Sequence, residues 1–372
     1  MSEQTEIRDE LRAVARDLLG GPGRAGQAAA APGGSDVDWQ VLAGADWLGL
    51  EVAAELGGAD ATFAEAAVIA EELGRAVARS PYLGAVVMSV GTLNELQPNA
   101  LRDRLLSEIA AGAVISAAVL GSGNGLASAG QPPPFRLERI AAGAVLHGQA
   151  SFVPDAASAG SLLLLAAGQD GSPVIVRTDP GVPGLTVTKQ PVLDATRSLG
   201  LVSAAGAEVS PDCVWQFAGD ARAASRRLLD RAAVAVACDS LGLSEAMLAA
   251  TVGYARVRQQ FGRAIGSFQA VKHACADMLV QIRVARELVA EAVQQVADRE
   301  CADDEATVAA SMAKSSACDA AVSIAGKAMQ LHGGIGYTWE SGIHVYLKRA
   351  ILNRELFGSP AAHRRRLAAR YA

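Results

Sequence analysis

The stretch YARVRQQFGRAIGSFQAVKHACADM, residues 254–278, decides how the C-terminal part of the chain is organised. Its first residues continue a helical pattern, which ends at Phe261 and Gly262. The chain then turns through Gly266 and is predicted to start a new helix with Ser267 as its N-cap. The side chains around this turn combine a bidentate phosphate donor, an aromatic ring and two amides: Arg258, Phe261, Gln260 and Gln269. Such a set suits a ligand that carries both phosphate and an aromatic ring.

A second motif, QLHGGIGYTWE at residues 330–340, follows a long predicted helix. Its paired glycines, Gly333 and Gly334, would let backbone N–H groups come close to a ligand. Taken alone, each of the two motifs could equally be a helix-turn device without a ligand.

Working outward from these motifs, helical periodicity covers residues 222–260, 267–298, 303–331 and 341–354. Helices of roughly 30 residues extend about 45 Å and are typical of a bundle. The first third, up to about Ala111, is also helical, whereas short apolar runs such as SLLLLAA at 161–167 and VIVRT at 174–178 predict strands in the middle. We therefore expect an α+β protein with a helical domain at 1–112, a β domain at 113–220 and a helical bundle at 221–372.

Composition excludes several classes of protein. Of 372 residues, 51% are hydrophobic and 19% charged, which excludes a disordered chain. The net charge of −6 gives no global attraction for nucleic acid, and the five cysteines and five histidines lack the spacing of a zinc or other metal site. The charged, amphipathic N-terminus and the absence of an apolar run of about 18 residues predict a cytoplasmic protein that does not insert into a membrane.

In this order along the chain, the two motifs and the helical and β thirds resemble the acyl-CoA dehydrogenase family. The resemblance covers essentially the whole chain, because residues 47–76 (WLGLEVAAELGGADATFAEAAVIAEELGRA) resemble the family's N-terminal helical signature and residues 196–210 (TRSLGLVSAAGAEVS) its β-domain exit. It implies an N-terminal α-helical domain, a middle β domain and a C-terminal four-helix bundle. It also implies a dimer or tetramer, homomeric or heteromeric, with FAD bound between subunits.

The resemblance assigns FAD contacts to residues of both motifs and of the β domain. Contacts with the pyrophosphate and adenosine fall to Arg258, Gln260, Phe261, Ile265, Phe268 and Gln269, and contacts from the adjacent subunit to Gln330 and Gly334. GQASFVPDA at 148–156 corresponds to the segment along the flavin ring, with Phe152 in place of the family's usual tryptophan and Pro154 in place of its threonine. The loop that contacts flavin and thioester in the family differs more strongly from the family's usual sequence, because it reads VLGSGNGLA here.

The general base is where the sequence departs most from the family. The usual glutamate near the C-terminus aligns with Gly358, and the alternative position on the first long C-terminal helix aligns with Ala232. Asp239, seven residues or nearly two turns after Ala232, lies on almost the same helix face in the apolar stretch AVACDSLGL. An unpaired carboxylate there would have a raised pKa, as a base at neutral pH requires. Asp239 is thus the candidate catalytic residue; the alternative is that it pairs with an arginine or caps a bend.

By resemblance, the chain is expected to be a flavin-dependent acyl-CoA dehydrogenase. Such an enzyme forms a trans-2-enoyl thioester by α-proton abstraction and β-hydride transfer to FAD, and passes electrons to an electron-transfer flavoprotein. The missing carboxylates leave an alternative open, a non-catalytic structural subunit of a heteromeric acyl-CoA dehydrogenase. The small Ala232 and Gly358 leave room for a bulky acyl group, such as a sterol side-chain thioester, as well as for a fatty acyl chain.

Overall fold

The computed structural model describes residues 3–20, 36–121, 132–140, 143–298 and 301–370. The N-terminal region is helical and contains α1 (Glu3–Gly20), α3 (Trp39–Gly44), η1 (Ala54–Leu56), α4 (Phe63–Arg75), the π-helix η2 (Leu83–Val90), α5 (Gly91–Asn94) and α6 (Ala100–Ala110). Thr62 begins α4 with a capping box, because its side chain accepts from the Ala64 N–H while the Glu65 carboxylate accepts from the Thr62 N–H. Twelve of the thirteen residues of α4 are buried, which makes it the central helix of this region.

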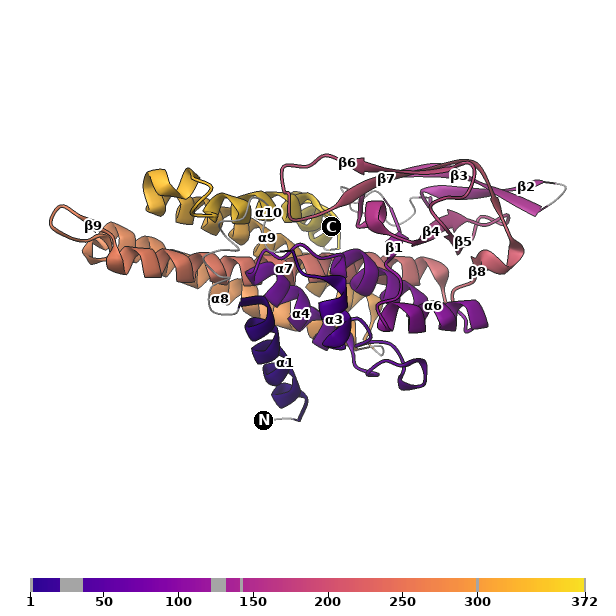
Figure 1. The fold of residues 1–372 in the computed structure, drawn as a ribbon, viewed down its shortest axis with the longest axis horizontal. Coiled ribbons are helices and arrows are strands. Elements are labelled where there is room, and N and C mark those ends of the chain that lie inside the picture. The colour runs from indigo at the N-terminus through magenta and orange to yellow at the C-terminus, as the bar shows by residue number, and fades with distance from the viewer. Residues whose placement is uncertain (1–2, 21–35, 122–131, 141–142, 299–300, 371–372) are drawn as a thin grey trace.

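The middle region is one mixed sheet with the order β6-β7-β3-β2-β4-β5-β8, and β1 pairs with β4. Its strands are β1 (Ser116–Val119), β2 (Phe135–Ile140), β3 (Gly143–Pro154), β4 (Ser161–Ala167), β5 (Pro173–Thr178), β6 (Leu185–Gln190), β7 (Leu199–Val209) and β8 (Val214–Trp215), with short 3₁₀ turns η3 (Ala156–Ser158) and η4 (Pro211–Cys213). Some apolar side chains of the sheet pack on the helices. Others form a separate hydrophobic cluster within the β region. The sheet lies beside the helices at one end of the molecule (Figure 1).

The C-terminal region is a bundle of long helices. It contains α7 (Ala221–Val257), β9 (Gln259–Gln260), β10 (Arg263–Ala264), η5 (Ile265–Ser267), α8 (Gln269–Ala297), α9 (Asp303–His332), η6 (Gly333–Tyr337), α10 (Ile343–Glu355) and α11 (Pro360–Ala369). Glycines allow α7 to cross α4 closely, because a Cβ at Gly74 would lie 2.1 Å from the Asp239 carbonyl oxygen and one at Gly242 1.9 Å from that of Glu71. This crossing holds the middle of α7 firmly against the N-terminal region.

The predicted α+β fold class is confirmed, with several local differences. In the helical first third, α3 ends already at Gly44, and residues 83–94 form a π-helix followed by α5. Ser267 is not an N-cap: its hydroxyl donates to the Ala264 carbonyl, and Phe268 holds the cap position. Among the described helices, only α7 is long and apolar enough to cross a membrane, and 78% of its apolar window is buried inside the protein.

Candidate functional site

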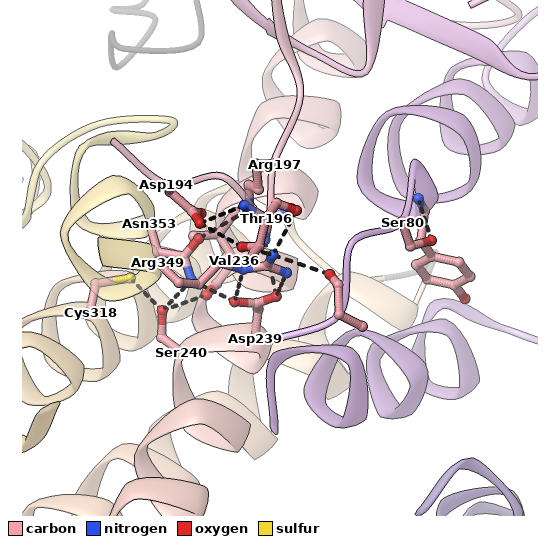
Figure 2. A network of polar contacts seen from close by, with 12 residues as sticks. Ser80, Asp194, Thr196, Arg197, Val236, Asp239, Ser240, Cys318, Arg349 and Asn353 are labelled. Carbon is pink, nitrogen blue, oxygen red and sulfur yellow. Dashed lines mark hydrogen bonds and ion pairs between the residues drawn. The ribbon is translucent and has the colours of Figure 1, made fainter. Parts of the chain in front are cut away.

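Asp239 lies at the centre of a buried polar cluster in the middle of α7 (Figure 2). Its carboxylate accepts two hydrogen bonds from Arg349, from Nε at 3.1 Å and from Nη2 at 2.6 Å. Arg197 Nη2 donates to the same group at 3.0 Å, and Asn353 Nδ2 donates at 2.6 Å. The carboxylate is therefore saturated by two guanidinium groups and one amide.

The same cluster joins all three regions of the chain. Arg349 on α10 also donates to the Ala78 carbonyl of the N-terminal region at 3.2 Å and to the Thr196 hydroxyl at 2.8 Å. Thr196 in turn donates to Asp194, and both precede β7. Asp239 thus anchors a junction where the helical bundle, the sheet and the N-terminal helices meet.

The charge environment of Asp239 is the reverse of the one expected from the sequence. Burial alone would raise its pKa, yet Arg349 and Arg197 outweigh burial and hold the pKa below its ordinary value. The expectation of an unpaired carboxylate with a raised pKa is therefore wrong, and the alternative, pairing with arginine, is what the structure contains. Asp239 as the base stays a prediction that these contacts do not favour.

The space beside Asp239 is small. A cavity of about 20 Å³ lies there, bordered by Asp239, Arg197, Arg349, Tyr82 and neighbouring apolar side chains. That volume suits one or two water molecules. The Tyr82 hydroxyl is buried and has no hydrogen-bond partner among the described residues, so it is a natural contact for such a water.

Neither of the family's usual base positions carries a carboxylate. Ala232 is fully buried in α7. Gly358 lies in a loop after α10 that is hydrogen-bonded to Lys314. The buried ammonium of Lys314 donates to the carbonyls of Asn353 at 3.0 Å, Arg354 at 3.2 Å and Gly358 at 2.9 Å. The neighbouring Phe357 carbonyl oxygen lies 3.0 Å from His363 Nε2. This loop is thus a rigid element.

The sequence analysis missed Lys314, although a signal was present. It is a single lysine in an alanine-rich, otherwise buried face of α9, and burial lowers its pKa. Such a residue needs several acceptors, which the carbonyls at the end of α10 supply.

The predicted nucleotide turn forms a small hairpin of β9 and β10 between α7 and α8. Phe261 occupies its tip with a left-handed backbone (φ 52°) and is 91% exposed. Its ring meets the Phe268 ring edge-on at 6.1 Å, and the Arg263 guanidinium covers Phe268 at 4.1 Å. Arg258 is exposed at the base of the hairpin. An aromatic surface beside exposed arginine thus faces outward.

The other predicted FAD contacts of this region lie on the same end of the bundle. Gln260 and Gln269 are exposed, Ile265 and Phe268 are half-buried, and Gln330 and Gly334 are exposed at the corner where α9 ends. Tyr254 stacks on His332 with a centroid distance of 4.5 Å and so joins the hairpin to the diglycine corner. The two motifs are therefore neighbours in one chain, a link that the sequence analysis did not predict. Contact of Gln330 and Gly334 with a flavin bound by another subunit stays a prediction.

Phe152 occupies an irregular point of β3. Its φ is 55°, and the register with β7 shifts between Ala150 and Val153. Its backbone N–H donates to the Gln190 side chain on β6. Left-handed, non-glycine residues at bulges are frequent at ligand sites, so this segment is suited to lie along a planar ring. Most of the VLGSGNGLA loop, residues 122–127, lies outside the described residues.

Asp155, three residues after Phe152, is a buried carboxylate whose pKa is raised. Burial raises the pKa to about 6, although the Gly84 N–H donates to it at 2.9 Å and Arg197 and Arg349 lie nearby. A Cβ at Gly84 would lie 2.9 Å from this carboxylate, so the contact joins β3 tightly to η2.

Asp155 makes the stability of the fold depend on pH. Because its pKa is raised above 3.8, its protonated form favours the folded state, and that contribution is lost as pH rises through about 6. Asp155→Asn keeps an acceptor for the Gly84 N–H but cannot ionise. We therefore expect the free energy of unfolding of this variant, relative to that of the unchanged protein, to rise by on the order of 1–3 kcal/mol from pH 4.5 to pH 7.5. Urea unfolding at both pH values measures this gain. A difference between the two proteins that stays constant with pH would contradict it.

The donor groups at the hairpin and corner fit FAD rather than a metal. Within the described parts of the chain, no three His, Cys, Asp or Glu side chains form a group able to hold a metal ion. Exposed arginine, aromatic rings, amides and glycine N–H groups are instead the partners that a dinucleotide requires.

Comparisons with known proteins agree with this fold. The acyl-CoA dehydrogenase N-terminal domain matches residues 1–113, and the acyl-CoA dehydrogenase C-terminal domain matches residues 192–372. Acyl-CoA dehydrogenase IpdE2 of Mycobacterium tuberculosis is 33% identical over 371 residues, which cover 97% of this chain and 96% of that protein.

Solved structures of similar fold cover almost the whole chain. The Tcur3481-Tcur3483 steroid ACAD has a TM-score of 0.83 at 27% identity, covering 98% of this chain and 97% of that one. The ChsE4-ChsE5 complex from Mycobacterium tuberculosis has a TM-score of 0.85 at 24% identity, covering 100% and 98%. Both family domains and a full-length relative thus match, and the chain belongs to the acyl-CoA dehydrogenase family of FAD-binding oxidoreductases.

Proposed function

We propose that this chain is a subunit of a heteromeric FAD-dependent acyl-CoA dehydrogenase. It helps to hold FAD, and a second chain of the same family supplies the carboxylate that removes the α-proton of the thioester. The observation that carries this proposal is the state of Asp239, whose carboxylate is shared by Arg349, Arg197 and Asn353.

A general base needs a free lone pair and access to its substrate. The lone pairs of Asp239 are engaged, because its oxygens accept four hydrogen bonds from these three residues, and the cavity beside it is small, about 20 Å³. Bound FAD would supply the hydride acceptor for the β-hydrogen, so that the product would be the trans-2-enoyl thioester. Electrons then leave to an electron-transfer flavoprotein or a similar acceptor.

The positions of the FAD-binding residues favour an oligomer. Phe152 precedes Asp155 by three residues, and the Asp155 carboxylate lies near Arg197 and Arg349 of the Asp239 cluster. Arg258 follows Asp239 by 19 residues, which is about 28 Å along the axis of α7. Figure 1 shows β9 at the end of the bundle remote from the sheet. One FAD molecule therefore meets the ring segment of one subunit and the nucleotide hairpin of another.

A heteromer also agrees with a similar structure. The Tcur3481-Tcur3483 steroid ACAD, at 27% identity over 98% of this chain, is named for two different chains. By the same likeness we propose a CoA thioester of a ring-bearing acid as the substrate of the complex. A fatty acyl thioester is the alternative that a substrate screen would distinguish.

The experiment that tests this proposal compares the purified chain alone with the chain isolated from its native cell through an affinity tag. Alone, the chain is expected to hold little FAD and to reduce no dye with any acyl-CoA. Isolated from the cell, it should carry a second acyl-CoA dehydrogenase chain, bound FAD and turnover. If the chain alone is yellow and turns over acyl-CoA at the rate of the isolated complex, the proposal is wrong.

A further inference from the structure

The two predicted FAD-binding motifs lie at the same end of the bundle but on different helices. The hairpin follows α7, whereas the diglycine corner follows α9. In the described parts of the chain, no hydrogen bond or ion pair joins residues 258–269 to residues 330–340. Another contact is therefore needed to hold the two motifs in a fixed relative position.

The rings of Tyr254 and His332 supply such a contact. Tyr254 lies in the last turn of α7, and His332 is the last residue of α9. Their ring centroids are 4.5 Å apart, and their planes are inclined by only 20°, so the rings are stacked. The stack thus joins the two helices at the points where the two motifs begin.

On the side of α7, the backbone ties the hairpin to Tyr254. The Arg258 N–H donates to the Tyr254 carbonyl at 2.9 Å, and the Arg258 carbonyl accepts from the Ile265 N–H at 2.8 Å. A Cβ at Gly266 would lie 2.9 Å from the Ala255 carbonyl oxygen, so η5 packs closely on the last turn of α7. The position of Tyr254 therefore determines where Arg258 and the hairpin lie.

On the side of α9, the His332 ring is fixed against the corner. Its Nδ1 lies 2.7 Å from the Ala328 carbonyl oxygen, and because a carbonyl only accepts, Nδ1 carries the proton. A Cβ at Gly336 would lie 2.6 Å from the Met329 carbonyl oxygen and 3.1 Å from the His332 Cβ. The 3₁₀ turn η6 thus folds back onto His332, and the position of this residue determines where the corner lies.

We propose that Tyr254 and His332 are positioning residues, whose ring stack holds the hairpin and the diglycine corner at the separation that one FAD nucleotide requires. Neither ring needs to touch the cofactor. Because the stack orders the two motifs before FAD arrives, binding does not have to supply that ordering. This inference rests on the proposed FAD-binding role of the two motifs and not on whether the complex is heteromeric.

Two substitutions of Tyr254 test the stack. Tyr254→Leu removes the ring and is expected to weaken FAD binding of the complex about 3- to 10-fold, which is the size of a typical aromatic pair. Tyr254→Phe keeps the ring and should bind FAD with a Kd within about twofold of the unchanged complex. Flavin fluorescence during titration of the FAD-depleted complex measures the Kd, and circular dichroism confirms that each variant folds.

A double-mutant cycle tests whether the two rings act as a pair. His332→Leu removes the stack from the other side and should also weaken FAD binding about 3- to 10-fold. Tyr254→Leu/His332→Leu should bind FAD within about twofold of either single variant, because both changes remove the same contact. His273→Leu makes the same change at an exposed histidine of α8 and should leave the Kd within about twofold.

The inference is overturned if both leucine variants bind FAD as tightly as the unchanged complex, or if Tyr254→Phe loses as much as Tyr254→Leu. Additive losses in the double variant would also overturn it, since the two rings would then act independently. Arg258→Ala separates this failure from failure of the FAD site. Loss of FAD in Arg258→Ala with none in Tyr254→Leu removes only the positioning role, whereas unchanged binding in both variants overturns the FAD site as well.

Discussion

Asp239→Ala is expected to lower the free energy of unfolding by about 3–5 kcal/mol, because it leaves two buried guanidinium groups without their carboxylate. Arg349 is 3% and Arg197 8% exposed at the side chain, so water cannot replace the lost partner. A residue that served only as a base would instead lose turnover and keep the stability of the fold. Urea unfolding followed by circular dichroism measures the change.

Two further variants test the origin of that loss. Asp277→Ala removes an exposed carboxylate from α8 and should change stability by less than about 0.5 kcal/mol. The pair Asp239→Asn/Arg349→Gln keeps similar side-chain sizes and removes one charge of each sign, so it should recover at least half of the loss. Equal losses in Asp239→Ala and the double variant would show that the ion pair is not the cause.

Arg258→Ala is expected to weaken FAD binding of the complex by roughly 1.5–3 kcal/mol, or about 10- to 150-fold in Kd. The reason is that the contact we propose between Arg258 and the pyrophosphate would be charge-assisted and, in the proposed oligomer, would lie between subunits. Flavin fluorescence during dialysis against FAD-free buffer measures this loss.

Arg256→Ala is the matched control for this prediction. Arg256 is an exposed arginine in the last turn of α7, two residues before Arg258. The Arg256→Ala variant should bind FAD with a Kd within about threefold of the unchanged complex, since Arg256 carries the same charge as Arg258 but lies outside the turn. Equal loss in both variants would mean that general charge, and not a contact of Arg258, holds the cofactor.

Periodicity predicted the helices of the bundle well, because each of them buries a long apolar stripe. α8 and α9 begin and end within two residues of the predicted limits. The N-terminal region was harder to predict. The π-helix at Leu83–Val90 is buried on all sides, so its apolar residues show no periodicity that would distinguish it from an α-helix.

The site was predictable only where local sequence determines it. The hairpin at Phe261 and the diglycine corner are local turns, and glycine positions indicate them. The partners of Asp239 could not be predicted, because Arg197 and Arg349 lie 42 and 110 residues away in the chain and meet it only through the packing of three regions. The raised pKa of Asp155 escaped prediction for the same reason, since the burial that raises it comes from packing against distant parts of the chain, such as the helix that contains Gly84.

The turnover number of the heteromeric complex, per bound FAD, with Asp239→Asn/Arg349→Gln in this chain distinguishes a structural Asp239 from a catalytic one. If Asp239 is a structural residue and the partner chain supplies the base, turnover per FAD should stay within about threefold of the unchanged complex. A fall of several orders of magnitude, with FAD still bound and the fold intact, would identify Asp239 as the base and contradict the account.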